Sequence, residues 1–120
     1  MKVIIAGSRT FNDYPLLRCT LDEFYLSTPI TEIVCGGAAG ADTLGKRWAE
    51  ENNIPVKMFD AQWHIYGKSA GMIRNLEMGE YADFLIAFWD GISPGTKHMI
   101  DYMKTHNKHG IICYFNKENN

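Results

Sequence analysis

The sequence predicts an α/β fold: a single Rossmann-like three-layer domain in which about five parallel strands are flanked by helices. Three observations support this prediction. The chain has 120 residues, a common size for one compact domain. Short apolar runs alternate along it with segments of helical period. The apolar runs are continuous rather than alternating with polar residues, which is typical of parallel strands covered on both faces.

Five apolar runs are the predicted strands, namely Val3–Ala6, Ile33–Cys35, Val56–Phe59, Phe84–Phe88 and Ile111–Phe115. Turn signals punctuate the chain evenly, and no linker-like, repetitive or low-complexity stretch divides it. We therefore expect residues 1–120 to form one domain.

Four segments between these runs are the predicted helices. They open near Asn12–Asp13, near Asp42, near Ser69 and near Thr96. In the third, Met72, Leu76 and Gly79 recur at helical spacing, which indicates an apolar stripe on a helix that runs to about Tyr81. The fourth is expected to bury its own stripe of Met99, Ile100 and Met103.

This order of elements places every strand-to-helix loop at one edge of the sheet, because parallel strands share a direction. Ligands of open α/β sheets bind at that edge. We therefore expect the functional residues to lie in four loops, which are Gly7–Phe11, Gly36–Asp42, Asp60–Lys68 and Trp89–Thr96.

The overall composition narrows the function. The net charge of −2 gives no basic surface for a nucleic acid polymer, although a few local cations suffice for a mononucleotide. The three cysteines are widely spaced and form no CxxC pair, so neither a disulfide framework nor a metal site is expected. No apolar run is long enough for a signal peptide or a membrane span, so we expect a cytoplasmic protein that binds no membrane.

The loop over Gly36–Asp42 contains three glycines and three alanines, so no bulky side chain blocks its backbone N–H groups. Such a loop can cradle a phosphate, although its GGxxG spacing is not GxGxxG and no Walker lysine follows. Asp42 leaves two alternatives open. Its carboxylate either caps the helix and repels an anion, which we favour, or holds ribose hydroxyls.

Two further glycine loops follow buried strands. Gly7 allows a sharp turn and a close approach to a ligand, and Arg9 can then form paired hydrogen bonds to a phosphate or carboxylate. In the fourth loop, Gly95 and Thr96 open a helix and form a second potential anion site. Each loop alone is a weak signal, and each has a plainer explanation as a tight turn. The convergence of three loops on one edge favours a ligand site.

The third loop and the helix after it add aromatic and cationic side chains. Trp63 and Tyr66 either stack on a base or cover the end of the core. Arg74 and Asn75 lie one helical turn beyond Gly71 and reach the same edge, and Arg74 is the best single candidate for a functional cation. The predicted ligand-binding residues are Gly7, Ser8, Arg9, Gly36, Gly37, Ala38, Gly40, Asp42, Trp63, Lys68, Arg74, Asn75, Trp89, Gly91, Ser93, Gly95 and Thr96.

As an ordered set over nearly the whole chain, these residues resemble a known family. The matching pieces are Gly7-Ser8-Arg9, Gly36 to Asp42, Gly67-Lys68, Ala70-Gly71, Arg74-Asn75, Trp89-Asp90-Gly91, Ser93 and Gly95-Thr96. Together they resemble the YspA-like, YpsA-related branch of the SLOG superfamily of Rossmann-like proteins. The resemblance implies a nucleotide or nucleotide derivative at the glycine loops. It also implies a homodimer or higher homo-oligomer, because members of the superfamily commonly pair.

The superfamily also includes LOG phosphoribohydrolases, which release a base from a nucleoside monophosphate. Their arginine on the third helix matches Arg74, whereas their PGGxGTxxE motif is broken here, because Met99 stands where the glutamate belongs. Cleavage of a glycosidic bond needs a carboxylate, which methionine cannot replace. We therefore rank binding above catalysis.

The leading hypothesis is a module that binds, senses or sequesters an anionic nucleotide derivative without a cofactor, an ADP-ribose-type signalling nucleotide being one version. The first alternative is a nucleotide hydrolase of the phosphoribohydrolase or N-glycosidase type, with Arg74 orienting the phosphate and Asp42 or Asp90 acting on water. The second alternative is an interaction protein with a degenerate site.

Overall fold

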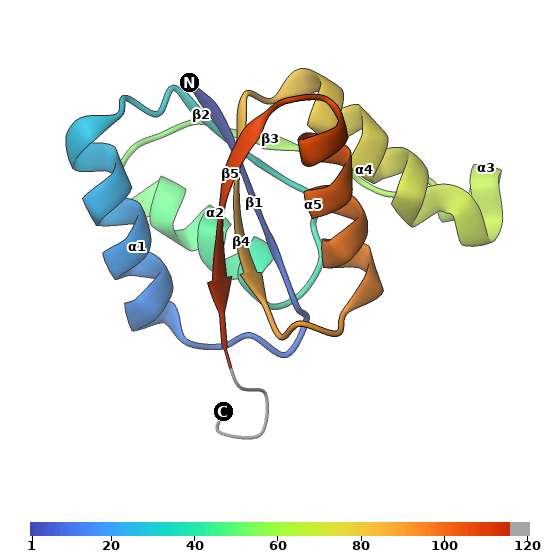
Figure 1. The fold of residues 1–120 in the computed structure, drawn as a ribbon, viewed down its shortest axis with the longest axis horizontal. Coiled ribbons are helices and arrows are strands. Elements are labelled where there is room, and N and C mark those ends of the chain that lie inside the picture. The colour runs from blue at the N-terminus through green and yellow to red at the C-terminus, as the bar shows by residue number, and fades with distance from the viewer. Residues whose placement is uncertain (116–120) are drawn as a thin grey trace.

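A computed structural model of the chain, which describes residues 1–115, contains one five-stranded sheet with helices on both faces (Figure 1). The strands are β1 Lys2–Gly7, β2 Glu32–Cys35, β3 Val56–Met58, β4 Phe84–Trp89 and β5 His109–Tyr114. The helices are α1 Tyr14–Ser27, α2 Ala41–Glu51, α3 Trp63–Tyr66, α4 Ala70–Tyr81 and α5 Pro94–Thr105. The predicted α/β class is confirmed. All five predicted strands are also confirmed, and each of their ends lies within two residues of the predicted position.

All neighbouring strands are parallel, and their order across the sheet is β3-β2-β1-β4-β5. The chain therefore builds outward from β1 to β3, then crosses back and builds outward from β4 to β5 on the other side. The turning point of this order lies between β1 and β4, where Val3 pairs with Phe84 and Gly7 pairs with Phe88. In open α/β sheets, the carboxyl ends of the two strands at such a point flank the ligand site.

The sheet separates two apolar clusters, and this gives the predicted three layers. On one face, Ile5 and Ile86 pack with side chains of α1 and α2, among them the fully buried Leu17 and Trp48. On the other face, Ile4 and other strand residues pack with side chains of α4 and α5. Figure 1 shows α1 and α2 on one side of the sheet and α4 and α5 on the other. Successive strand residues point to opposite faces, so continuous apolar strands supply both clusters.

The apolar stripe predicted for α4 is wrong at Met72 and Leu76, and only its third member, Gly79, is buried. Met72 and Leu76 are 57% and 44% exposed, and the buried residues of this helix are instead Ala70, Asn75, Met78 and Gly79. The buried face includes a polar residue, because the Asn75 amide donates a hydrogen bond to the backbone oxygen of Gly95 at 3.1 Å. An apolar pattern cannot reveal a face whose packing depends on such a bond.

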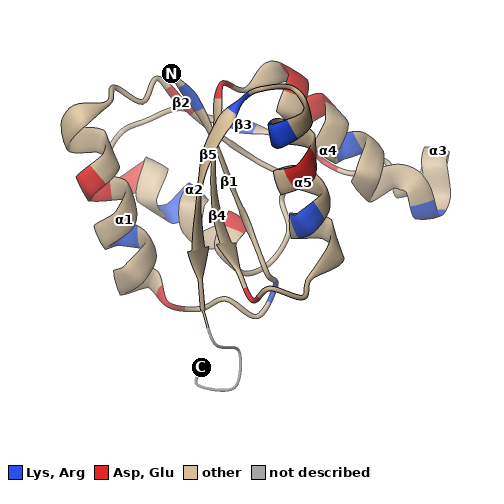
Figure 2. Cartoon of the chain, viewed as in Figure 1, with Lys and Arg blue, Asp and Glu red and all other residues tan. Residues whose placement is uncertain are grey.

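Residues of both charges are interspersed along the helices (Figure 2). Positions of both signs occur on α1, α4 and α5, which fits the small net charge of −2. Within residues 1–115, no helix is long and apolar enough to cross a membrane.

Candidate functional site

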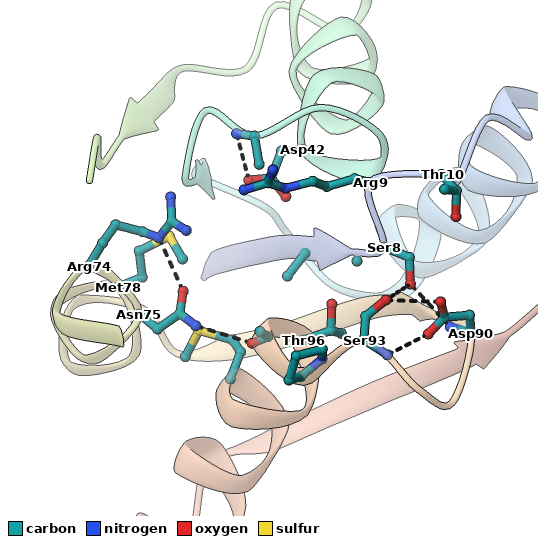
Figure 3. Close-up of a pocket in the computed structure, with 16 residues that line it drawn as sticks. Ser8, Arg9, Thr10, Asp42, Arg74, Asn75, Met78, Asp90, Ser93 and Thr96 are labelled. Atoms are coloured by element: carbon teal, nitrogen blue, oxygen red, sulfur yellow. Dashed lines mark hydrogen bonds between the residues drawn. The ribbon is translucent and has the colours of Figure 1, made fainter. Parts of the chain in front are cut away.

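A cavity of about 440 Å³, here called the first cavity, opens at the carboxyl ends of β1 and β4. Its walls come from the loop after β1, the start of α2, one face of α4 and the first turn of α5 (Figure 3). This is the turning point of the strand order. A volume of this size is in the range of small-molecule sites, roughly 300–1,000 Å³.

One end of the first cavity is fixed by hydrogen bonds among Ser8, Asp90 and Ser93. The Ser93 hydroxyl lies 3.0 Å from Ser8 Oγ and 2.9 Å from Asp90 Oδ2. The backbone N–H groups of Ile92 and Ser93 donate to Asp90 Oδ1 at 2.9 and 2.8 Å. Desolvation alone would raise the pKa of Asp90, but these backbone hydrogen bonds and those with the Ser93 and Ser8 side chains outweigh it and lower the pKa to about 2. Asp90 is therefore a stable anion that braces the loop, and a weak base at neutral pH.

Asp42 contacts the loop between β2 and α2, residues 36–40, here called the glycine loop. Its Oδ2 accepts hydrogen bonds from the backbone N–H groups of Gly36 and Ala38 at 3.0 and 3.3 Å. The predicted capping of the helix by Asp42 is wrong, because Gly40 is the N-cap of α2 and no side chain caps this end. Asp42 sits within the first turn of α2, so its carboxylate reaches back to the loop. The same contact occupies two of the N–H groups expected to cradle a phosphate.

Asp42 is only 7% exposed, and this burial changes its pKa. Desolvation raises its pKa from 3.8 to about 6, against the hydrogen bonds from Gly36 and Ala38 and the positive charges of Arg74 and Arg9. A carboxyl group with a pKa near neutrality, beside two arginines in a cavity, can bind a hydroxyl or exchange a proton.

Arg74 extends from α4 to the glycine loop. Its Nη1 donates to the backbone oxygen of Gly36 at 2.6 Å, and its Nε donates to Asn75 Oδ1 at 3.1 Å. The Asn75 amide in turn binds the backbone oxygen of Gly95 and lies 3.2 Å from His98 Nδ1. Asn75 therefore holds both the guanidinium and the start of α5 in place.

Arg9 enters from the loop after β1. Figure 3 shows Arg9 and Arg74 extending toward each other from opposite sides of the first cavity. Arg9 is exposed, and none of the ion pairs found within residues 1–115 includes it. A cation without a carboxylate partner remains available to an anionic ligand.

The first turn of α5 forms another wall of the first cavity. No side chain caps this helix, because the Ser93 hydroxyl is engaged with Ser8 and Asp90. The first N–H groups of a helix have no acceptor within it and carry partial positive charge, so the N–H groups of Gly95 and Thr96 favour an anion. Thr96, 5% exposed, also lines the cavity, and its hydroxyl points into it (Figure 3).

A second cavity of about 420 Å³ adjoins the first. Arg9, Ala38 and Arg74 line both cavities. The residues that line the second cavity alone are Gly36, Gly37, Ala39, Asp60, Ala61 and Trp63.

The structure thus brings most of the predicted site residues together. Those lining the first cavity are Gly7, Ser8, Arg9, Ala38, Asp42, Arg74, Asn75, Ser93, Gly95 and Thr96, and Gly36, Gly37 and Trp63 line the second. The predicted residues that line neither are Gly40, Lys68, Trp89 and Gly91. Trp89 instead donates to the backbone oxygen of Ser93 at 3.0 Å, and its ring lies against Tyr114.

The explanation of Trp63 and Tyr66 as a cover for the core is wrong, since their side chains are 55% and 48% exposed. Both lie on the short helix α3, and Trp63 faces the second cavity whereas Tyr66 lines neither.

The predicted ligand-binding residues omitted nine that line the cavities. Asp90 was named only as a catalytic candidate and Met99 only as the position of the missing glutamate. The other seven are Ala6, Thr10, Met78 and Pro94 in the first cavity and Ala39, Asp60 and Ala61 in the second. Met78 follows Arg74 and Asn75 by one helical turn, so the period of α4 was a usable signal for it. Thr10 and Ala61 lie in expected loops, but their types carry no signal of their own. Within residues 1–115, no group of three His, Cys, Asp or Glu side chains is placed to hold a metal ion.

Comparison with known proteins gives two matches. Residues 1–66 match the model of the YspA, cpYpsA-related SLOG family. The chain is also 39% identical over 104 residues to the Gene 61 protein of Mycobacterium phage D29, an alignment covering 81% of this chain and 83% of that protein. No solved structure matches the chain. The family model covers more than half of the residues, including β1, the glycine loop and Asp42, so this chain belongs to the YspA, cpYpsA-related SLOG family.

Proposed function

We propose that this protein binds an anionic nucleotide or nucleotide derivative in the first cavity. The observation that carries the proposal is the convergence of Arg9, Arg74 and the uncapped first turn of α5 on one cavity at the turning point of the sheet. Membership of a SLOG family supports a nucleotide-related function.

The charges of the site favour a phosphate over a neutral ligand. Arg9 and Arg74 supply charged donors, and the N–H groups of Gly95 and Thr96 supply a second set on α5. Asp42 offsets part of this positive charge, and it is an acceptor for ribose hydroxyls. A ligand with a phosphate next to a sugar matches this arrangement.

Arg74→Ala tests the proposal by isothermal titration calorimetry with AMP, ADP and ADP-ribose. A hydrogen-bonded charge pair contributes enough free energy that its loss should weaken binding by about 10- to 100-fold. Arg18→Ala is the matched control, because Arg18 is a solvent-exposed arginine of α1 that pairs with Asp22 at 3.6 Å and lines neither cavity. Absence of binding by the unmodified protein, or equal losses in both variants, would contradict the proposal.

Hydrolysis of the bound nucleotide is a second candidate function, and Asp42 is the observation that favours it. The pKa of Asp42 is raised to about 6, whereas that of Asp90 is lowered to about 2, so Asp42 is the better general base of the two. Met99, at the position of the LOG glutamate, lines the first cavity but carries no proton-transferring group.

Chromatography of nucleotides incubated with the protein separates the two functions. Under the binding proposal the nucleotides stay intact. Release of base or phosphate that disappears in Asp42→Asn would establish hydrolysis instead.

A further inference from the structure

The two cavities share a wall that carries two arginines, neither of which belongs to an ion pair found within residues 1–115. Arg9 and Arg74 line both the first cavity, of about 440 Å³, and the second, of about 420 Å³. Each cavity alone is near the lower end of the range for small-molecule sites, roughly 300–1,000 Å³, and the two together approach its upper end. A ligand that fills both cavities has its middle beside the shared arginines, so its negative charge belongs there.

The second cavity offers a flat aromatic surface. A Cβ placed on Gly71 would lie 3.5 Å from Trp63 Cη2 and 4.0 Å from Arg74 Nη2, so the edge of the indole and the guanidinium flank the same glycine. More than half of the Trp63 side chain is exposed to solvent. An exposed indole beside an arginine is suited to stack on a heterocyclic ring.

Asp60 places a carboxylate in the wall of the second cavity. Its Oδ1 would lie 2.9 Å from a Cβ on Gly37, which places the carboxylate beside the glycine loop. None of the ion pairs found within residues 1–115 engages Asp60. A free carboxylate accepts hydrogen bonds from ring N–H groups or hydroxyls and repels a terminal phosphate.

We infer that the ligand is two-ended, with two ring-bearing groups joined through an internal diphosphate. The diphosphate lies between Arg9 and Arg74 and extends toward the first turn of α5. One ring stacks on Trp63 with its donors toward Asp60, and the other group fills the rest of the first cavity. This inference rests on the proposed function and specifies its ligand class.

Calorimetry with the full chain tests the inference by comparing ADP with three two-ended probes, namely ADP-ribose, NAD⁺ and diadenosine diphosphate. ADP carries more negative charge than any of the three, so attraction by charge alone favours ADP. We expect at least one two-ended probe to bind about tenfold more tightly than ADP, the gain typical of one further stacked or enclosed ring. Equal or weaker binding of all three overturns the inference.

Trp63→Ala then tests whether the second cavity is used. With the tightest two-ended probe we expect a loss of about tenfold, and Trp63→Phe should recover most of it because phenylalanine keeps a stacking face. Tyr66→Ala is the matched control, since Tyr66 is an exposed aromatic residue of the same helix that lines neither cavity. Equal affinities of Trp63→Ala and Tyr66→Ala overturn the inference.

Ala61→Trp provides an independent check that does not remove Trp63. Added bulk in the second cavity should abolish the advantage of two-ended probes over ADP, and a retained advantage counts against the inference. Binding of ADP without any advantage for two-ended probes would refute only the two-ended ligand. Failure of ADP and of every other probe to bind the unmodified protein would refute the proposed function as well.

Discussion

Arg74 is held in position before any ligand arrives. Its guanidinium binds the backbone oxygen of Gly36 and the side chain of Asn75, and Asn75 is itself anchored to Gly95. A charged donor fixed in this way loses little conformational freedom on binding, so more of its interaction energy appears as affinity. Asn75 thus acts as a positioning residue for Arg74.

Gly36→Ala should disturb Arg74 without altering the arginine itself. A Cβ on Gly36 would lie 2.4 Å from Arg74 Nη1 and 2.8 Å from Cζ, so the end of this flexible side chain must move. We expect the variant to fold and its affinity for ADP to fall about tenfold or more, measured by calorimetry. Gly71→Ala is a control for the loss of a glycine, because Gly71 lines neither cavity and the nearest neighbours of its new Cβ, Trp63 Cη2 and Arg74 Nη2, would lie at ordinary contact distances of 3.5 and 4.0 Å. Unchanged affinity in Gly36→Ala would show that the position of Arg74 is unimportant.

Asp42→Asn should change how stability depends on pH. The pKa of Asp42 rises from 3.8 to about 6 on folding, so its contribution to stability is full below about pH 4 and is lost as pH rises through about 6. We expect the unfolding free energy of the variant, relative to the unmodified protein, to increase by roughly 2–3 kcal/mol between pH 4 and pH 7.5. Urea unfolding at both pH values measures this difference.

Asp101→Asn serves as the control of opposite sign. The hydrogen bond and charge of Lys97 lower the pKa of Asp101, so its contribution is present above its unfolded pKa and lost as pH falls. If the unfolding free energy relative to the unmodified protein increased from pH 4 to pH 7.5 in both variants, the role assigned to burial at Asp42 would be contradicted.

At the residue scale, the sequence predicted the loops better than the contacts within them. The spacing of Gly36, Gly37 and Gly40 predicted a loop at the ligand edge of the sheet, and the structure places Gly36 and Gly37 in the wall of the second cavity. The phosphate cradle expected of this loop stays a prediction, because Asp42 already accepts hydrogen bonds from two of its N–H groups. The partners of Asp42 could not be predicted, because they depend on a local backbone conformation that includes a positive φ of 76° at Gly37.

Helix α4 shows what limits prediction at the element scale. Its buried face combines Asn75 with Met78 and Gly79, and its exposed face carries Met72 and Leu76. Hydrophobic periodicity identified the helix correctly but chose the wrong face, because the tertiary hydrogen bond of Asn75 to Gly95 is invisible to an apolar pattern.

Lys108 completes the carboxyl end of α4. Its Nζ donates to the backbone oxygens of Gly79, Glu80 and Ala82 at 2.6, 3.2 and 2.8 Å. The last carbonyls of a helix lack hydrogen-bond donors within it and carry partial negative charge. Lys108 supplies both the donors and a positive charge.

Lys108→Met should therefore destabilise the protein. We expect the free energy of unfolding to fall by about 1–3 kcal/mol in urea, because buried or half-buried carbonyls lose a charged donor. Lys104→Met is the control, since Lys104 is an exposed residue of the last turn of α5. Equal stabilities of the two variants would contradict the capping role.

At the scale of the whole molecule, the order β3-β2-β1-β4-β5 decides where the site lies. Alternating strands and helices predicted a parallel sheet with its loops at one edge, and both features are confirmed. The sequence did not specify that the first cavity opens between β1 and β4, because that depends on which strands become neighbours. Pairing between β1 and β4 joins residues about eighty positions apart, beyond the reach of local patterns.

The central claim is that an anionic nucleotide occupies the cavity between β1, β4 and the first turn of α5. Backbone amide chemical shifts recorded by NMR during titration with ADP test it most directly, because every loop reports separately. The claim predicts that the largest shift changes fall on Ser8, Arg9, Ala38, Gly95 and Thr96, with little change along α1 or at the amino ends of the strands. Shift changes centred elsewhere on the molecule, or none at saturating ADP, would contradict it.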